Sequence, residues 1–224
     1  MALDDKTCQH RRVATVVRPF RGVSAEDRLA QRRAILLDAG LDEIAAVGVA
    51  GLRMRSVCER SGLVRRYFYE QFPNRDDLVL ALFDDMMRKI AERMMAETEG
   101  VPLDLHTRAC VAMDQFLGVF LDDPRLIRLY VEAASSPLLA AARAAAISRS
   151  VDFASGHVRA VLGELDEDTR VRIDTAIRVI VIGQADVAMA WLRGEIALSG
   201  PDYAELVAHA FVDAISGVHA RSTR

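Results

Sequence analysis

Arginine and tyrosine side chains crowd one short stretch of the sequence, residues 64–71, and both residue types suit contacts with nucleic acid. The guanidinium groups of Arg65 and Arg66 each offer a fork of N–H donors that matches the edge of guanine or a phosphate. Tyr67 is placed to touch a thymine methyl group or a base edge. Three further side chains are expected to hold phosphates and to set the register of the protein on DNA: Tyr69, Arg55 and Arg75.

The charge of the chain is divided unevenly, although its net value is only −3. Residues 1–75 carry 14 Arg and Lys against 9 Asp and Glu, a net charge of +5, whereas residues 76–224 carry 15 against 23, a net charge of −8. This division predicts that the first third meets a polyanion such as double-stranded DNA, which the acidic body repels. Residues 1–23 lack periodicity and hold four arginines, so we expect a flexible basic arm. The arm is either simply solvated or reaches phosphates or the minor groove.

Residues that could catalyse a reaction or hold a metal ion are not grouped in the sequence. No nucleophile elbow, phosphate-binding loop, dinucleotide fingerprint or zinc-protease motif occurs. The histidines show no metal-ligand spacing: His10, His106, His157, His209 and His219. The Asp-Asp pairs at 76–77, 84–85 and 122–123 suit helix ends and solvated faces. The sequence therefore predicts no enzyme, no cofactor and no metal site.

The cysteines and the hydropathy pattern indicate the cellular compartment in which the protein is expected. Cys8, Cys58 and Cys110 are widely spaced and odd in number, which predicts free thiols in a reducing cytoplasm. No uninterrupted apolar run reaches 18 residues, so no membrane span is expected. The N-terminus is polar and shows no apolar signal segment.

Helices must position the arginines and tyrosines. Ser24-Ala-Glu-Asp27 has the pattern of a capping box and begins a helix that runs to about Val47. Its predicted inner face holds Leu36, Gly40, Ile44 and Val47, and Gly48 and Gly51 end it. Short helices are predicted over 54–61 and 64–71, joined at Gly62, where glycine allows a left-handed backbone.

The end of the second short helix is also marked. Phe68 and Phe72 lie four residues apart, so they share a face and are expected to be buried. Pro73 ends the helix, and Asn74 caps a long helix that continues to about Glu97. Two short helices joined by a glycine turn form a helix-turn-helix, whose second helix fits the major groove.

Segment 35–78 resembles the TetR family of bacterial transcriptional repressors. The matching residues are Ile35-Leu36, Ala39-Gly40, Val57-Cys58, Ser61-Gly62-Leu63, Tyr69, Phe72-Pro73, Arg75 and Leu78. The resemblance implies that Arg53 and Val64 stand where the family has capping Thr or Ser residues, and each lost cap is worth roughly 1 kcal/mol. It also implies that Arg66 and Tyr67 replace a small Gly and Thr. We therefore include Arg53 and Val64 among the residues expected to contact DNA.

Residues 98–224 are predicted to form further helices, over 102–121, 125–134, 138–163, 166–196 and 202–218. Seven side chains on the first four are expected to line a small-molecule site: Met113, Phe116, Phe120, Tyr130, Phe153, His157 and Gln184. For the aromatic residues, simple core packing is the alternative. Gln184 sits in an apolar run, and a buried amide needs a partner, either a ligand, a backbone carbonyl or a second subunit.

The last two predicted helices are apolar on more than one face. One stripe is needed for the core of the chain, so the surplus predicts a partner helix pair. The resemblance implies the same arrangement, a homodimer formed through the last two helices as a four-helix bundle.

These patterns together predict an all-α protein with an arm over 1–23, a helix-turn-helix domain over 24–78 and a ligand-binding and dimerisation domain over 98–224. The helix that begins after Pro73 connects the two domains. We expect a homodimeric, cytoplasmic transcriptional repressor that binds a pseudo-palindromic operator and is released by an unknown small-molecule effector. The alternative is a helical small-molecule-binding or scaffold protein with weak or vestigial DNA binding.

Overall fold

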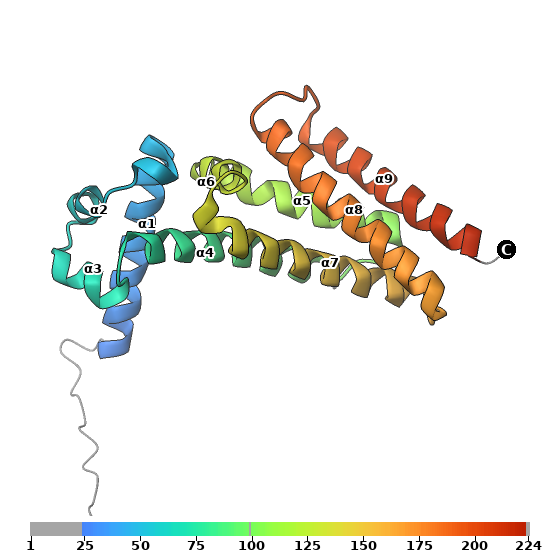
Figure 1. Cartoon of the computed structure of the whole chain (residues 1–224), viewed down its shortest axis with the longest axis horizontal. Helices are drawn as coiled ribbons and strands as arrows, with labels where there is room; N and C mark the ends of the chain where they lie inside the picture. Colours follow the sequence, from blue (N-terminus) through green and yellow to red (C-terminus); the bar gives the residue numbers. More distant parts are fainter. Residues whose placement is uncertain (1–23, 99, 223–224) are drawn as a thin grey trace, which may run out of the picture.

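The computed structural model of the chain describes residues 24–98 and 100–222, and every regular element in this part is a helix (Figure 1). The predicted all-α class is confirmed, whereas the arm predicted for residues 1–23 lies outside the described residues. The elements are α1 (Ala25–Gly51), α2 (Met54–Ser61), α3 (Arg65–Gln71), α4 (Arg75–Thr98), α5 (Leu105–Asp122), α6 (Arg125–Ala133), the 3₁₀ turn η1 (Pro137–Leu139), α7 (Ala140–Leu162), α8 (Glu167–Leu192) and α9 (Gly200–Ser222).

Helix α1 begins as the sequence predicts and ends with a kink. The Ser24 hydroxyl accepts a hydrogen bond from the Asp27 N–H at 2.9 Å, and the Asp27 carboxylate accepts one from the Ser24 N–H at 3.2 Å. Gly48 breaks the regular helix with a φ of 80° and a ψ of 171°. The prediction that Val47 packs inward is wrong, because the side chain is 46% exposed beside this break.

The helix-turn-helix consists of α2, a turn and α3. Gly62 has a φ of 67° in the turn, the left-handed conformation predicted for it. Phe68 and Phe72 are buried, as their spacing predicts. Neither Arg53 nor Val64 forms a side-chain cap, so the starts of α2 and α3 lack the hydrogen bond that Ser or Thr would supply.

Helix α4 connects the helix-turn-helix to the rest of the protein. Asn74 accepts a hydrogen bond from the Asp77 N–H at 3.0 Å and donates one to its carboxylate at 2.8 Å, which fixes the start of the helix. The apolar side chains that recur at the helical period share one face and are all buried: Leu78, Leu82, Met86 and Ile90. In Figure 1, α4 runs from the group formed by α1, α2 and α3 into the C-terminal bundle.

Several ends of the C-terminal helices differ from the sequence prediction. Helix α5 begins at Leu105 rather than near residue 102, because the Asp104 carboxylate caps it through the Thr107 N–H at 2.7 Å. Helix α8 ends at Leu192 rather than near residue 196, because Gly194 turns the chain with a φ of 75°. The periodicity of the apolar side chains does not indicate where these helices begin and end.

The C-terminal bundle packs α5 against α4 and α9, and α7 against α8 (Figure 1). Helices α8 and α9 lie side by side as an antiparallel pair on its outer surface. Among the described residues, α8 is long and apolar enough to cross a membrane by length and composition, although only 17% of its most apolar window is buried. The apolar surplus predicted for the last two helices is therefore exposed in the single chain, as at Val179 and Leu206.

Candidate nucleic-acid interface and effector cavity

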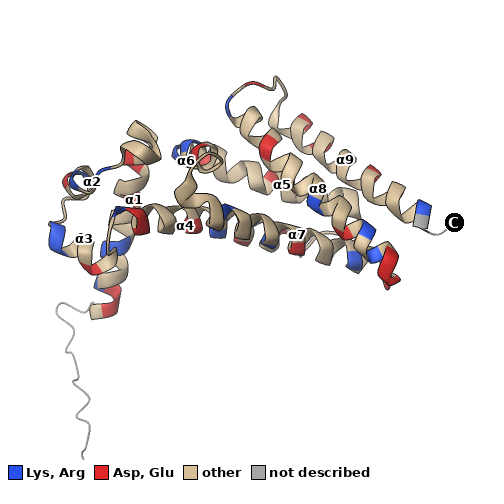
Figure 2. Ribbon diagram, in the orientation of Figure 1, with Lys and Arg blue, Asp and Glu red and all other residues tan. Residues whose placement is uncertain are grey.

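The outer surface of α2 and α3 carries most of the side chains predicted to contact DNA. Exposed residues on it are Arg53, Arg55, Val64, Arg65, Arg66 and Tyr69. Figure 2 shows basic residues on α2, on α3 and in the segment before α2, at the end of the molecule remote from α8 and α9. Helix α3 has only seven residues, so its exposed N-terminal turn forms a compact tip that suits a DNA groove.

Two of these arginines are paired with acids one helical turn later. Arg55 donates to Glu59 at 2.7 Å and Arg66 donates to Glu70 at 3.0 Å. Exposed pairs of this kind contribute little to stability, so a phosphate or guanine could replace the carboxylate at small cost. No ion pair in the described part of the chain reaches Arg65, whose guanidinium is therefore available for DNA.

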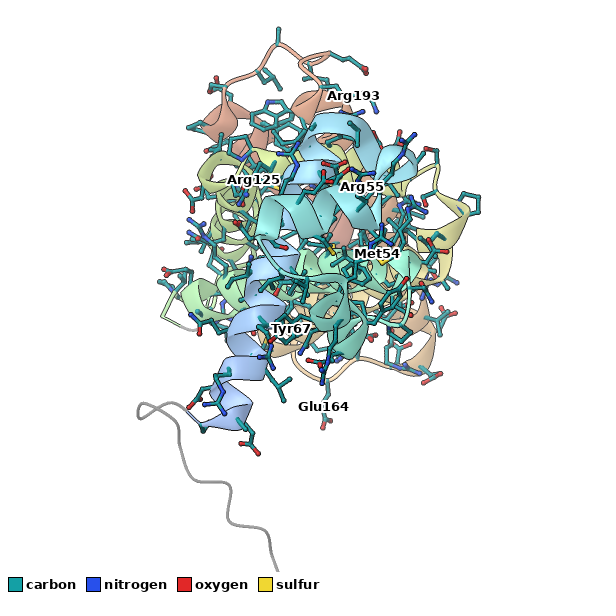
Figure 3. The ribbon with its side chains drawn as sticks, turned by 90° about the vertical axis from the view of Figure 1, so that its left-hand side faces the viewer. Met54, Arg55, Tyr67, Arg125, Glu164 and Arg193 are labelled. Atoms are coloured by element: carbon teal, nitrogen blue, oxygen red, sulfur yellow. The ribbon has the colours of Figure 1, made fainter. Side chains whose placement is uncertain are left out.

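Tyr67 is held more tightly than its neighbours on α3. Its ring lies under the Arg32 guanidinium of α1, whose Cζ is 4.6 Å from the ring centroid. Figure 3 views the molecule from this end and places Tyr67 against α1, with Arg55 on α2. A cation–π contact of this type is worth ~0.5–1 kcal/mol at an exposed site, so it orients the ring without burying it fully.

Arg75 points into the protein instead of toward a DNA surface. Its guanidinium donates to the carbonyl oxygen of Leu52 at 2.9 Å, to that of Val49, and to the Asp76 carboxylate at 2.9 Å. These bonds tie the start of α4 to the end of α1. A phosphate contact would compete with these bonds, and the predicted DNA-binding role of Arg75 stays a prediction.

An ion pair between an exposed arginine and a buried glutamate joins α2 to α1. Arg60 donates to Glu43 at 2.7 Å, and the Glu43 side chain is only 7% exposed. The pair sets the orientation of the helix-turn-helix because α2 presents its arginines from the opposite side of the same short helix. Removing one partner would leave a charge without compensation.

Helix α6 joins the C-terminal bundle to α1 through charged side chains. Arg125 donates to Asp38 at 3.0 Å and to Asp42 at 2.6 Å. Arg128 and Glu132 contact the kink of α1, where the Glu132 carboxylate accepts a hydrogen bond from the Val49 N–H at 2.6 Å. A displacement of α6 would therefore move α1 and the helix-turn-helix.

An apolar cavity of about 170 Å³ lies inside the C-terminal bundle. Six of the seven predicted side chains line it: Met113, Phe116, Tyr130, Phe153, His157 and Gln184. The structure thus brings together residues from α5, α6, α7 and α8.

Phe120 is the predicted residue that does not reach the cavity. Its ring packs behind two lining residues, with centroids 5.2 Å from Phe116 and 5.0 Å from Tyr130, and it is 1% exposed. The helical repeat placed Phe120 four residues from Phe116 and so on the same face. It could not show that α6 covers this end of α5.

Polar groups in the cavity are few and incompletely paired. The Gln184 amide donates to the Met113 sulfur at 3.2 Å, which is a weak acceptor. The same amide lies beside the Tyr203 hydroxyl, which has no hydrogen bond of normal geometry. Burial raises the pKa of Tyr203 and the amide lowers it in part. His157 donates from Nδ1 to the Phe153 carbonyl at 2.9 Å, which leaves Nε2 as an acceptor in the neutral ring.

Sequence reasoning missed the charged groups of the cavity. Arg108 and Arg143 both line it. Arg108 donates to two backbone carbonyls before α5, at 3.1 and 3.3 Å, whereas no hydrogen bond or ion pair in the described residues reaches Arg143. Burial raises the pKa of the neighbouring Tyr130 phenol well above its usual value. Arg143 lies in the Ala-rich start of α7. A single arginine among small apolar residues could have indicated a charged group at the cavity.

The fold and the exposed tip of α3 define a helix-turn-helix DNA-binding protein. Residues 36–82 match the family described as bacterial regulatory proteins, tetR family. No curated protein matches the sequence. Residues 36–82 thus carry the DNA-binding region of the tetR family of bacterial regulatory proteins, which confirms the resemblance drawn from residues 35–78.

Solved structures share the fold of nearly the whole chain. A TetR-like transcriptional regulator from Rhodococcus sp. RHA1 is 16% identical, with a TM-score of 0.64 over 84% of this chain and 97% of that one. A tetR-family regulator from Streptomyces coelicolor is 16% identical, with a TM-score of 0.66 over 86% and 83%. The regulator FadR from Bacillus subtilis, solved in complex with stearoyl-CoA, is 18% identical, with a TM-score of 0.59 over 82% and 98%.

Proposed function

We propose that this protein is a homodimeric transcriptional repressor that binds a pseudo-palindromic operator and releases it when a small molecule enters the cavity. The observation that carries the proposal is the exposed tip of α3, where Arg65 and Arg66 stand free or only weakly paired. In a dimer, two such tips would enter successive major grooves ~34–36 Å apart. Val64 and Tyr69 flank the arginines, and Arg53 and Arg55 extend the surface toward the phosphates.

Dimerisation through α8 and α9 is supported by their exposed apolar side chains. Those on α8 are Val171, Val179, Ile182 and Val187, and Leu206 belongs to α9. Exposed apolar side chains gathered on one helix pair suit a partner surface of the same composition. Two copies of the α8–α9 pair would bury it as a four-helix bundle.

The composition of the cavity suggests the class of the effector. Its walls are mainly apolar, and Arg143 offers a positive charge that no acid in the described residues neutralises. An elongated apolar molecule with an anionic group would satisfy both features. The stearoyl-CoA bound by the FadR structure is a molecule of this type, so acyl chains with anionic heads are the first compounds to test.

Helix α6 offers a route from the cavity to the DNA-binding helices. Tyr130 and Ala133 line the cavity, while Arg128 and Glu132 on the same helix contact the kink of α1. An effector that binds one position of α6 better than another would shift the population toward that position. The separation of the two α3 helices would change with it, and operator affinity would fall.

A second candidate is a helical ligand-binding protein with weak DNA binding, which the uncapped starts of α2 and α3 favour. Selection of bound sequences from a random pool of double-stranded DNA separates the two. The repressor proposal expects an enriched sequence with two related half-sites, and addition of an acyl-CoA should release the protein from it. Recovery of no enriched sequence would favour the second candidate.

A further inference from the structure

Three side chains with metal-binding atoms meet where α5 lies beside α9, and a cysteine stands beside one of them. His106 and Cys110 are one turn apart on α5, and Glu205 and His209 are one turn apart on α9. One ligand atom from each of His106, Glu205 and His209 lies within 4.8 Å of the others. The two helices come from opposite ends of the C-terminal bundle's sequence, so their approach in the fold creates the group.

The distances within the group match those of a coordination shell. His106 Nε2 is 3.4 Å from His209 Nδ1, and the ring centroids are 4.3 Å apart. Two nitrogens bound to one tetrahedral Zn²⁺ at ~2.0–2.1 Å stand about 3.3 Å apart. Glu205 Oε1 is 3.8 Å from His209 Nδ1, so a small rotation of the carboxylate would complete the third side.

The alternative without a metal is a pair of histidines that share a hydrogen bond. That bond would be poor at 3.4 Å, and His209 Nδ1 already lies 3.0 Å from the Glu205 carbonyl oxygen. A carbonyl oxygen only accepts, so Nδ1 carries the proton in the metal-free protein and its N–H is shared between the Glu205 carbonyl oxygen and His106 Nε2. Binding of a metal ion through Nδ1 would release this proton and replace both contacts.

Cys110 stands next to this group. Its sulfur is 3.9 Å from both ring nitrogens of His106. Bound to a metal ion, Cys110 would release its thiol proton into solution and hold the ion as a thiolate.

We propose that His106, Glu205 and His209, with Cys110 as the fourth ligand, bind one divalent transition-metal ion of the zinc class. Imidazole, carboxylate and thiolate are all ligands that Zn²⁺ accepts, and a thiolate disfavours Mg²⁺ and Ca²⁺. The absence of a metal site predicted from the sequence is thereby revised. The signal was present as two pairs with i,i+4 spacing, His-x-x-x-Cys and Glu-x-x-x-His, in helices whose contact the sequence does not reveal.

The metal would link α5 and α9 beside the cavity. Leu105 and Ala109 on α5 and Ala208 on α9 line the cavity wall, next to the residues of the site. The ion would be held by two ligands on each helix, so separation of α5 from α9 would require two metal–ligand bonds to break. Bound metal would therefore stabilise the bundle independently of DNA binding and of any effector.

The test uses the full-length, tag-free protein after treatment with chelator. Zn²⁺ is titrated in competition with a chromogenic indicator, and Co²⁺ is used separately as a spectroscopic probe. We expect one equivalent of Zn²⁺ per chain and a higher melting temperature in its presence. Glu205→Gln and His209→Asn should each weaken Zn²⁺ binding by more than ~100-fold. Loss of a residue that only hydrogen-bonds to a metal ligand typically weakens binding by ~10–100-fold. Both residues are exposed, so the variants should fold.

Glu97→Gln is the matched control, because Glu97 is an exposed glutamate on α4 outside the group. It should bind Zn²⁺ like the natural chain. Binding that does not saturate at one equivalent, or equal affinity of the Glu205 and Glu97 variants, would overturn the site. A near-ultraviolet sulfur-to-cobalt band that is lost in Cys110→Ser supports the fourth ligand, and its absence from the natural chain would overturn that assignment.

Discussion

Gly48 lies at the kink of α1, where α6 contacts it. Replacement of Gly48 by alanine should destabilise the protein strongly. A Cβ atom at Gly48 would lie 2.6 Å from Glu132 Oε1 and 2.9 Å from an Arg128 nitrogen. Its φ of 80° and ψ of 171° form a backbone conformation that only glycine adopts readily. Gly163 has a similar conformation, φ 75° and ψ −154°, but its Cβ would meet no atom within 4 Å.

The two glycines separate backbone strain from loss of the contact with α6. Strain alone should cost ~1–3 kcal/mol in either variant. Gly48→Ala must also displace the Glu132 carboxylate from the Val49 N–H, and hydrogen bonds to charged groups are worth ~1.5–3 kcal/mol. Gly48→Ala should therefore be less stable than Gly163→Ala by about 1.5–3 kcal/mol. For a chain of this length, that corresponds to a melting temperature lower by roughly 3–12 °C.

Urea unfolding and thermal melting, both followed by circular dichroism, measure the difference. The natural chain and the two variants are compared at equal concentration, because dimerisation makes stability depend on concentration. If Gly48→Ala and Gly163→Ala lose equal stability, the contact between α6 and the α1 kink contributes nothing, and α6 cannot transmit a signal through it.

Three further predictions follow from packing and charge. Val179→Asp should convert dimers to monomers in sedimentation velocity, because Val179 is 67% exposed on the proposed partner face. Leu121 is 66% exposed on α5, so Leu121→Asp should stay dimeric. The same oligomeric state in both variants would contradict the assignment of α8 and α9 as the dimer interface. Arg60→Gln should lower the free energy of unfolding by about 1–3 kcal/mol in urea, since it leaves the charge of the buried Glu43 carboxylate uncompensated. Arg125 lowers the pKa of Asp123, so their pair stabilises the fold above the unfolded carboxyl value of ~3.9 and loses this effect as pH falls through the folded value. The stability gap between the natural chain and Asp123→Asn should thus be present at neutral pH and close in acid, and a gap that persists there would refute this linkage.

The helix-turn-helix was predictable because local signals define it. A capping box at Ser24, a glycine at 62 and a phenylalanine pair at 68 and 72 each act within one helical turn, and each is observed where the sequence places it. The buried face of α4 was predictable for the same reason, since its apolar side chains recur at the helical period. Six of the seven side chains predicted for the cavity do line it, and they lie on α5, α6, α7 and α8.

Features that depend on contacts between distant segments were not predictable. Exposed and buried roles for arginine look alike in a sequence, so Arg75 was assigned to phosphate although it binds backbone carbonyls of α1. The side chain of Tyr67 was assigned to bases without knowledge of Arg32 above its ring. The group around His106 requires the approach of two helices that are about a hundred residues apart in the chain. Periodicity describes one helix at a time and cannot supply such pairs.

The charge of the interface also needed the structure. Within residues 24–75, nine arginines face seven acids, and several of the arginines are internally paired. The excess of positive charge on the first third therefore comes largely from residues 1–23, which carry five Arg and Lys against two Asp and lie outside the described residues. Contacts by α3 must consequently rely on a small number of free guanidinium groups.

The central claim, that the tip of α3 binds operator DNA, is tested most directly by the operator affinity of arginine variants measured over a range of salt concentrations. Fluorescence anisotropy with the selected operator should give an affinity that falls steeply and linearly with salt on logarithmic axes. Arg65→Ala and Arg66→Ala should each cost ~1–3 kcal/mol per contact, so roughly 2–6 kcal/mol in a symmetric dimer. Arg88→Ala, which removes an exposed, ion-paired arginine from α4, should leave affinity unchanged. An affinity independent of salt, or intact binding by both α3 variants, would contradict the account.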